Sequence, residues 1–344
     1  MRLAGLVDNK QMGIGALIKI GKLRVVVAGV GIVAAVIAAV FYVNLWAAPE
    51  KSAEVERFVI PLGYSNEQAA AKLKEEGFIK SEVGWRIAWG LRRGGREITS
   101  GGYKLSKAIS AWQTAGILKG ASYMKWVVIP EGMRKEETAE ILTKELGWSE
   151  AEKEKWVMVD TAINSDHTEG VYFPDTYLIS VDEEPTRVAE RMRTTFNEKI
   201  APYAAEALKQ NIKWTTLIKI ASIAQREAAG KEDMPVIAGV LWNRLEDGMK
   251  LQIDATVQYA RGDKGKGWWA PITIADKKID SPYNTYKYMG LPPHPIVSPG
   301  LSAIEAVLHP QKTKCFYYLH DRAGDIHCAE TYVEHQKNIE EYLK

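Results

Sequence analysis

Cysteine is scarce in this chain of 344 residues, which contains only Cys315 and Cys328. Two cysteines are too few for a disulfide scaffold or a zinc cluster. The six histidines are scattered, and the sequence has no HExxH, CxxC or GxSxG motif, so metal-dependent and serine-nucleophile chemistry find little support. A net charge of +2 gives no case for a nucleic-acid binder. The sequence therefore predicts an ordinary globular protein with neither a metal nor a cofactor.

The near-neutral total hides an asymmetry, because residues 1–24 carry a net charge of +4 and the remainder carries −2. Residues 25–43 contain no charge, and with Leu45 and Trp46 this run nearly spans a hydrocarbon core of roughly 30 Å. A buried core helix would need a polar face, and a cleavable signal peptide usually has a shorter apolar run, although 46–48 resembles a weak cleavage site. We expect a cytoplasmic tail at 1–24 and a transmembrane helix at 25–46, with the rest outside the cell (inner) membrane.

A short linker, 47–55, leads to two similar segments, FVIPLGYSNEQAAAKLKEEG at 58–77 and VVIPEGMRKEETAEILTKEL at 127–146. At an offset of 69 residues, eight positions are identical. Each copy has an apolar triplet, a Pro-x-Gly turn and apolar residues at helical spacing. The pattern predicts a small α+β module over 56–165 that contains this internal repeat. Between the copies, the arginines and glycines of 90–102 indicate a solvated basic loop.

From residue 166 onward, helices alternate with loops rich in proline, glycine, asparagine and tyrosine, so we expect a second, mixed α+β domain over 166–344. Residues 298–300 (SPG) open a helix, and the segments CFYYLH and IHCAETY flank a turn at 321–325 in a predicted hairpin. Cys315 and Cys328 fall on opposite arms of that hairpin. A disulfide and two separate small apolar side chains both remain open.

A predicted helix over 215–230 carries the strongest candidate for acid–base chemistry. Leu217, Ile220, Ala221 and Ala224 form an inward-facing stripe that leads to Glu227. Loss of solvent around a carboxylate raises its pKa, as a general acid requires near neutral pH. Taken alone, the pattern favours the simpler interpretation, a solvent-facing or ion-paired Glu at a helix end.

The next predicted helix, 233–248, has Asp233 as its N-cap and places Arg244 within reach of a site formed with the preceding helix. The following loop contributes Gln252, Asp254 and Thr256. Asp254 is a candidate second carboxylate, but an Asp at this place more often caps a helix, and we weight that interpretation more.

Five motifs in order resemble the MltG/YceG-like endolytic murein transglycosylases: TEGVYFPDTY at 168–177, ASIAQREA at 221–228, LQIDATVQY at 251–259, the segment 281–310 and YYLHDRAGDIHCAETYVEH at 317–335. The resemblance implies that Glu227 is the catalytic residue and that part of the repeat module is LysM-like. Departures include Gln225 in place of an acidic residue and Cys328 in place of Phe. They bear on substrate fit rather than on the reaction class.

The implied substrate is peptidoglycan glycan, cut between N-acetylmuramic acid and N-acetylglucosamine with formation of 1,6-anhydro ends. Glu227 would act as acid and then as base, and a glycan synthase is an expected partner. Two alternative functions for the chain remain open: a tethered glycan-binding module without catalysis, and a hydrolytic muramidase. The candidate sugar contacts are Glu169, Arg244, Gln252, Asp254, Thr256, Tyr283, Asn284 and Tyr286. An excess of Tyr and Trp over Phe, concentrated in 268–288, suggests stacking on sugar.

Overall fold

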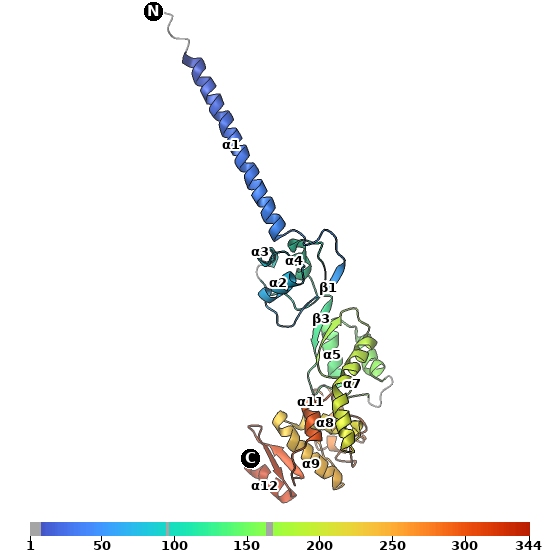
Figure 1. The fold of residues 1–344 in the computed structure, drawn as a ribbon. Helices are drawn as coiled ribbons and strands as arrows, with labels where there is room; N and C mark the ends of the chain where they lie inside the picture. The colour runs from blue at the N-terminus through green and yellow to red at the C-terminus, as the bar shows by residue number, and fades with distance from the viewer. Residues whose placement is uncertain (1–7, 94–95, 163–167) are drawn as a thin grey trace, which may run out of the picture. The chain divides into compact units, whose positions relative to one another are not determined.

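The computed structural model describes residues 8–93, 96–162 and 168–344, and it forms two compact units, Met1–Met124 and Lys125–Lys344. Both units mix helices and strands, as expected, and are coloured along the chain in Figure 1. The expected module over 56–165 is divided between these units. Its boundaries and a LysM-like part stay predictions.

The first unit begins with a long helix, α1 (Asp8–Leu45), which starts well before the expected residue 25. Its segment Val26–Leu45 is long and apolar enough to cross a membrane, and none of it is buried in the protein. The basic positions 10, 19, 22 and 24 lie on the same continuous helix.

The remainder of the first unit is an antiparallel strand pair that packs with three helices. Strand β1 (Val55–Ile60) pairs antiparallel with β2 (Gly101–Ser106), with Phe58 opposite Tyr103. The core includes Phe58, Leu73, Trp85 and Tyr103. The helices are α2 (Asn66–Glu75), α3 (Glu82–Arg93) and α4 (Ala111–Lys119), and capping boxes at Ser65 and Ser110 start α2 and α4.

The prediction of a basic loop over 90–102 is wrong at both ends of that range. Residues up to Arg93 belong to α3, and Gly101 starts β2, while 94–95 lie outside the described residues. A Cβ on Gly101 would lie 2.5 Å from the backbone oxygen of Met124, and one on Gly102 would lie 2.9 Å from the Met124 side chain. These glycines therefore serve close strand packing rather than loop flexibility.

Both repeat segments adopt the same order of elements. Strand β1 and helix α2 start at 55 and 66, and strand β3 (Met124–Val128) and helix α5 (Lys135–Leu146) start at 124 and 135, so the offset of 69 residues is kept. The shared strand–turn–helix order matches the expectation for each copy, but the copies lie in different units. The internal repeat within one module stays a prediction.

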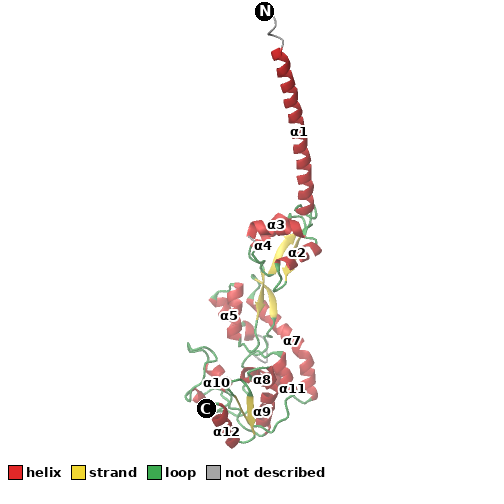
Figure 2. Ribbon diagram, turned by 90° about the vertical axis from the view of Figure 1, so that its left-hand side faces the viewer, coloured by secondary structure: helices red, strands yellow, loops and turns green. Residues whose placement is uncertain are grey.

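The second unit is mainly helical around one core, which includes Trp156, Tyr172, Met192, Ile220 and Ile304. Helix α8 packs against α7, α9 and α11, and β3 lies beside β4. Figure 2 shows the long loops around α10 in green. The remaining elements are α6 (Glu150–Met158), β4 (Thr176–Ser180), α7 (Pro185–Lys209), α8 (Trp214–Glu227), α9 (Met234–Glu246), α10 (Asp254–Arg261), α11 (Leu301–Leu308) and α12 (Tyr332–Tyr342). Single turns of 3-10 helix occur at Asp160–Ala162, Lys231–Asp233 and Asp276–Lys278.

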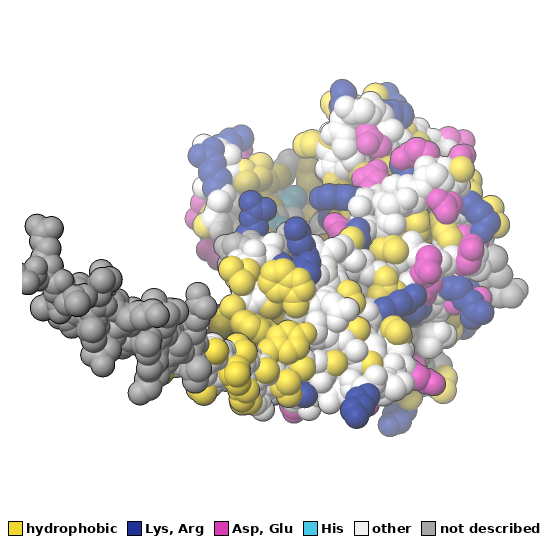
Figure 3. Space-filling view, turned by 90° about the horizontal axis from the view of Figure 1, so that it is seen from above, with side chains coloured by type: hydrophobic (Ala, Val, Ile, Leu, Met, Phe, Trp, Pro, Cys, Tyr) yellow, Lys and Arg dark blue, Asp and Glu magenta, His cyan; other side chains and the backbone are white. Residues whose placement is uncertain are grey.

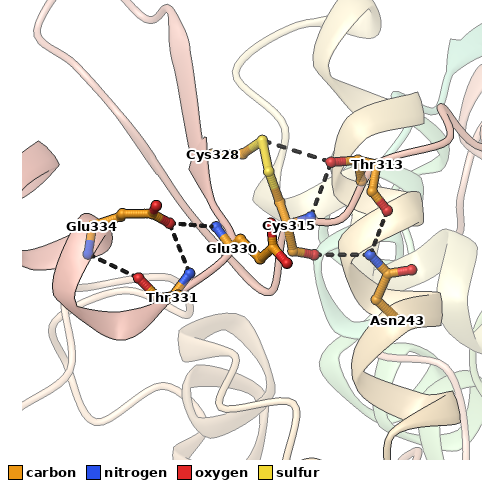
Figure 4. Close-up of a disulfide and its surroundings, with 7 residues drawn as sticks. All are labelled: Asn243, Thr313, Cys315, Cys328, Glu330, Thr331 and Glu334. Atoms are coloured by element: carbon orange, nitrogen blue, oxygen red, sulfur yellow. Dashed lines mark hydrogen bonds between the residues drawn. A yellow bond between two sulfur atoms is a disulfide. The ribbon is translucent and has the colours of Figure 1, made fainter.

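The C-terminal hairpin is confirmed. Strand β5 (Tyr317–His320) pairs antiparallel with β6 (Ile326–Ala329). Of the two states left open for the cysteines, the structure has the disulfide between Cys315 and Cys328 (Figure 4). Asn243 of α9 donates 2.9 Å hydrogen bonds to the backbone oxygens of Thr313 and Cys315, so the start of the hairpin is fixed to α9.

Candidate active site

Helix α8 brings Glu227 to the site in the way its sequence predicts. Leu217, Ile220, Ala221 and Ala224 are fully buried, and Glu227 is the last residue of the helix. The helix ends three residues before the expected Gly230. The Asp233 carboxylate accepts the N–H groups of Ala229 and Gly230, each at 3.2 Å, and these bonds shape the link to α9.

The Glu227 side chain is half-buried and is held by two donors. The Tyr318 hydroxyl donates to Oε2 at 2.7 Å, and the backbone N–H of Ala255 also donates to the carboxylate. Burial is the main reason that the pKa of Glu227 is raised, and the negative charge of Asp254 adds to the rise. The bond from Tyr318, the bond from Ala255 and the charge of His320 oppose it. The result is a carboxyl group that retains its proton above the usual pH.

Tyr318 and His320 are the main members of the site that the sequence does not single out. They alternate on β5, so they share one face of the strand. The Tyr318 hydroxyl stays protonated because burial and the nearby Glu227 raise its pKa well above the usual value. His320 lies 3.2 Å from the Asp233 carboxylate, which connects β5 to the link after α8. The sequence predicts the hairpin that carries these two residues, but it does not predict which face of the hairpin contacts α8.

Asp254 and Tyr286 form a polar pair beside Glu227. The Tyr286 hydroxyl donates to Asp254 Oδ1 at 2.5 Å, and Lys277 Nζ donates to the same hydroxyl at 3.1 Å. Asp254 is exposed and lies in the first turn of α10, whose N-cap is Ile253. The favoured interpretation of Asp254 as a helix cap is therefore wrong, and its charge acts on Glu227 instead.

Gln252 is also exposed, and its backbone has a φ of 53°. Residues other than glycine rarely adopt this left-handed conformation, and where they do, it often marks a functional site. Its N–H donates to the backbone oxygen of Thr285 at 3.1 Å, which fixes the loop.

Arg244 lies near the site but uses its guanidinium on the backbone. Its Nε donates to the Phe316 oxygen at 2.5 Å, and Nη1 donates to the Leu251 oxygen. Arg244 therefore positions β5 and the loop before α10.

Two further candidates are fully buried and support the same loops. The Thr256 hydroxyl bonds the Ile253 oxygen at 2.7 Å and the Thr285 hydroxyl at 2.8 Å. The Asn284 side chain donates to the Lys277 and Ile279 oxygens and accepts the Tyr286 N–H. Because neither side chain reaches solvent, direct contact with a sugar is not supported for them.

Glu169 belongs to another cluster. It is fully buried, and it accepts the N–H groups of Lys135 and Gly170 at 3.2 Å. Burial and the charge of Glu136 raise its pKa to about 8. Glu169 thus caps the start of α5 and has no exposed surface for substrate.

The aromatic residues of 268–288 are partly committed to protein contacts. Arg134 lies 4.0 Å from the Trp268 ring, and Arg226 lies 3.9 Å from the Trp269 ring. Tyr283 is half-buried against Tyr259, with ring centroids 4.7 Å apart. One face of each of these indoles is therefore not free to stack on sugar.

A cavity of about 900 Å³ lies elsewhere in the second unit, between the α7–α8 link, α9 and residues 310–313. It is lined by none of the predicted site residues, and its acidic lining residue, Glu246, is exposed. Glu227 therefore remains the stronger candidate for acid–base chemistry.

A half-buried carboxyl group with a raised pKa and fixed donors at the end of a packed helix is suited to acid–base catalysis. The chain belongs to the YceG-like family, whose model matches residues 58–341. The resemblance seen in the motifs is thereby confirmed.

Relatives with assigned activity support the same class. The chain is 32% identical over 309 residues to the endolytic murein transglycosylase of Bacillus subtilis (strain 168), covering 83% of this chain and 84% of that protein. It is 34% identical over 177 residues to the enzyme of the same name from Streptococcus pneumoniae (strain D39), covering 51% of this chain and 32% of that protein. The expectation of a lytic transglycosylase is confirmed at the level of the family.

A solved structure has the same fold. The crystal structure of a YceG-like protein from Listeria monocytogenes is matched with a TM-score of 0.56 and 28% identity, covering 83% of this chain and 99% of that one.

Proposed function

We propose that this chain is a membrane-anchored endolytic murein transglycosylase in which Glu227 acts first as acid and then as base. The observation that carries the proposal is the environment of Glu227: a half-buried carboxyl with a raised pKa, held by Tyr318 and Ala255. The activity in the names of the relatives supports the substrate, peptidoglycan glycan strands.

In the acid step, the protonated Glu227 donates its proton to the oxygen that links N-acetylmuramic acid to N-acetylglucosamine. The bond from this oxygen to the muramyl C1 breaks as the proton arrives. Burial and the charge of Asp254 hold the proton on Glu227 until that moment. Asp254 therefore serves as an electrostatic partner.

In the base step, the Glu227 carboxylate removes the proton from the muramyl C6 hydroxyl, whose oxygen bonds to C1. The Tyr318 hydroxyl and the Ala255 N–H stabilise the carboxylate that exists between the two steps. The proton lent to the leaving oxygen is replaced by the one taken from C6, so no water is consumed and the product has a 1,6-anhydro end.

The exposed side chains beside Glu227 are the proposed sugar contacts. Gln252 and Asp254 offer hydrogen-bonding groups, and the half-buried rings of Tyr286 and Tyr283 offer apolar faces. The fully buried Thr256 and Asn284 hold these loops in place. Arg244 contributes through β5 and the loop before α10.

The segment Val26–Leu45 is the proposed membrane anchor, with the +4 tail on the cytoplasmic side and both folded units outside. An anchored enzyme would act close to newly made strands, which makes a glycan synthase a reasonable partner. Alkaline extraction of membranes tests the anchor: an integral protein stays in the pellet, and a cleaved one is released.

Product analysis on uncrosslinked glycan strands separates the proposal from its rivals. A lytic transglycosylase yields anhydro-ended fragments from within the strands. A hydrolytic muramidase with Asp254 as second carboxylate yields reducing ends heavier by one water. A binding module without catalysis yields no fragments, and either of these results would refute the proposal.

A further inference from the structure

We propose that helix α3 and Trp112 of α4 form a membrane-contact surface that lies in the headgroup region of the leaflet from which α1 emerges. This surface, called the α3 surface below, consists of Val83, Ile87, Leu91 and Trp112. The proposal rests on the membrane anchor proposed above and adds a second contact with the same bilayer.

Helix α3 is apolar on two faces. Its inner face carries Trp85, Ala88 and Trp89, which are almost fully buried in the core of the first unit. Its outer face carries Val83, Ile87 and Leu91 at a spacing of four residues, with exposed fractions of 58%, 42% and 74%. Large apolar side chains in a row on an exposed helix face indicate a contact outside the protein itself.

The position of α3 relative to α1 shows which contact this is. The Trp46 indole N–H donates to the Gly84 oxygen at 2.6 Å, and Lys80 Nζ donates to the Val43 oxygen at 3.5 Å. The start of α3 is therefore within about one turn of the end of the proposed span at Leu45. The headgroup layer extends roughly 5–8 Å beyond the hydrocarbon core. The start of α3 therefore lies at the depth of the headgroups.

The other end of α3 faces the end of α1 across a cavity. Leu91 lines an apolar cavity of about 310 Å³ together with Ala88, Trp112, Tyr42 and Trp46. Gly84 accepts a hydrogen bond from Trp46, and Leu91 shares this cavity with Tyr42 and Trp46. Because both ends of α3 face the end of α1, α3 runs across it instead of leading away from it. An amphipathic helix that lies across the end of a membrane span is placed in the plane of the interface.

The charges around the α3 surface suit anionic lipid. Residues 80–93 contain four basic side chains and one acidic one. The Arg92 guanidinium lies 4.3 Å from the Trp112 ring, and Arg86 is exposed beside Ile87. Figure 3, viewed from the α1 end, shows the apolar side chains of α1 as part of a continuous hydrophobic area that follows the grey start of the helix. Basic residues near an apolar face bind lipid phosphates, and Trp belongs at this depth.

Spin labels on single cysteines in the full chain test the proposal. Both native cysteines are joined in a disulfide, so an introduced thiol is labelled selectively. The test positions are Leu91→Cys and, as a second site, Val83→Cys. The matched control is Leu62→Cys, which is 56% exposed in the same unit but follows the far end of β1. Ile37→Cys reports on the anchor.

The chain is reconstituted in nanodiscs that contain phosphatidylglycerol, and the labels are exposed to oxygen, which partitions into lipid, and to a water-soluble nickel chelate. We expect the ratio of oxygen to nickel accessibility to be several-fold higher at Leu91 and Val83 than at Leu62. Equal ratios at Leu91 and Leu62, with Ile37 in lipid, would overturn the α3 surface and leave the anchor intact. Ile37 in water would refute the anchor itself. Protection of Leu91 from both reagents would mean a protein partner and would also overturn the proposal.

Discussion

At the scale of single residues, the proposed chemistry depends on the balance of groups around the Glu227 carboxyl. Burial and Asp254 favour the protonated form of Glu227, while Tyr318, Ala255 and His320 favour the ionised form. Groups of both kinds are needed around a residue that first gives and then takes a proton, which is the role proposed for Glu227.

Replacing Tyr318 by Phe is expected to shift the pH profile. The hydroxyl donates to the ionised carboxylate, so its loss raises the pKa of Glu227 further. The acid step needs the protonated form of Glu227, so the alkaline limb of the kcat/KM profile moves to higher pH. We also expect kcat to fall, because the carboxylate loses a hydrogen-bond donor worth about 1.5–3 kcal/mol. The measurement is kcat/KM against pH on soluble glycan strands.

Two controls accompany this variant. Tyr317→Phe alters the neighbouring residue on the other face of β5, where its ring packs against Tyr332 and His335, and should leave the limb in place. Asp254→Asn removes a charge that raises the pKa of Glu227, so the limb should move to lower pH. A shift of the same sign for Tyr318→Phe and Asp254→Asn would contradict the assigned roles.

Glu169 is expected to make stability depend on pH. Its pKa rises from 4.5 to about 8 on folding, so the folded chain holds a proton that the unfolded chain releases between these values. Since the folded state binds more protons there, the free energy of unfolding falls as pH rises through this window, by an amount of order several kcal/mol. Glu169→Gln should flatten the dependence.

Denaturant midpoints of the full chain in detergent, below pH 4.5 and above pH 8, measure this effect. Glu140→Gln is the control, since Glu140 is exposed on α5, the helix whose start Glu169 caps. If wild type and Glu169→Gln lost stability in parallel with rising pH, Glu169 would not be the responsible group.

At the scale of elements, the C-terminal hairpin is the support of the site. Its strand β5 carries Tyr318, and the disulfide, Asn243 and Arg244 hold its start against α9. A cross-link that closes a short loop stabilises chiefly by restricting the unfolded chain.

Cys315→Ala and Cys328→Ala should each destabilise the second unit by about 2–3 kcal/mol, given the separation of 13 residues. Because either change removes the same bond, the double variant should cost no more than one single variant. Urea unfolding of the three variants measures this. Additive losses would mean that the cysteines act as separate packed side chains.

The elements also show where sequence reasoning succeeds. The stripe from Leu217 to Ala224 predicts α8 and the place of Glu227, because a periodic apolar pattern directly reports a buried face. The hairpin follows from its turn and its two apolar arms. Strand β2 was missed because Gly101 and Gly102 have low strand propensity, and only their close contact with Met124 explains them.

The loops around the site could be only partly predicted. Gln252 and Asp254 are exposed, while Thr256 and Asn284 are buried, although all come from equally polar segments. Which side of a loop faces solvent depends on the elements that it packs against, and that information is not local in sequence. The docking of Tyr318 on Glu227 depends in the same way on contacts between residues 91 positions apart.

At the scale of the whole molecule, the chain combines an apolar helix segment long enough to cross a membrane, a unit with an exposed apolar surface and a unit with the candidate acid–base site. The mildly acidic charge of residues 25–344 is consistent with sugar capture by hydrogen bonds and apolar contacts rather than by bulk charge. Family membership extends over both units, from residue 58 to 341, so the site and the first unit belong to one enzyme architecture.

The central claim is that Glu227 alone performs both proton transfers, and mass spectrometry of glycan fragments tests it most directly. Wild type and Glu227→Gln, with circular dichroism to verify the fold, are incubated with uncrosslinked strands. The account predicts anhydro-ended fragments from wild type and at least a hundredfold fewer from the variant, the usual scale for loss of a general acid–base. Anhydro ends formed by Glu227→Gln at the wild-type rate would contradict it.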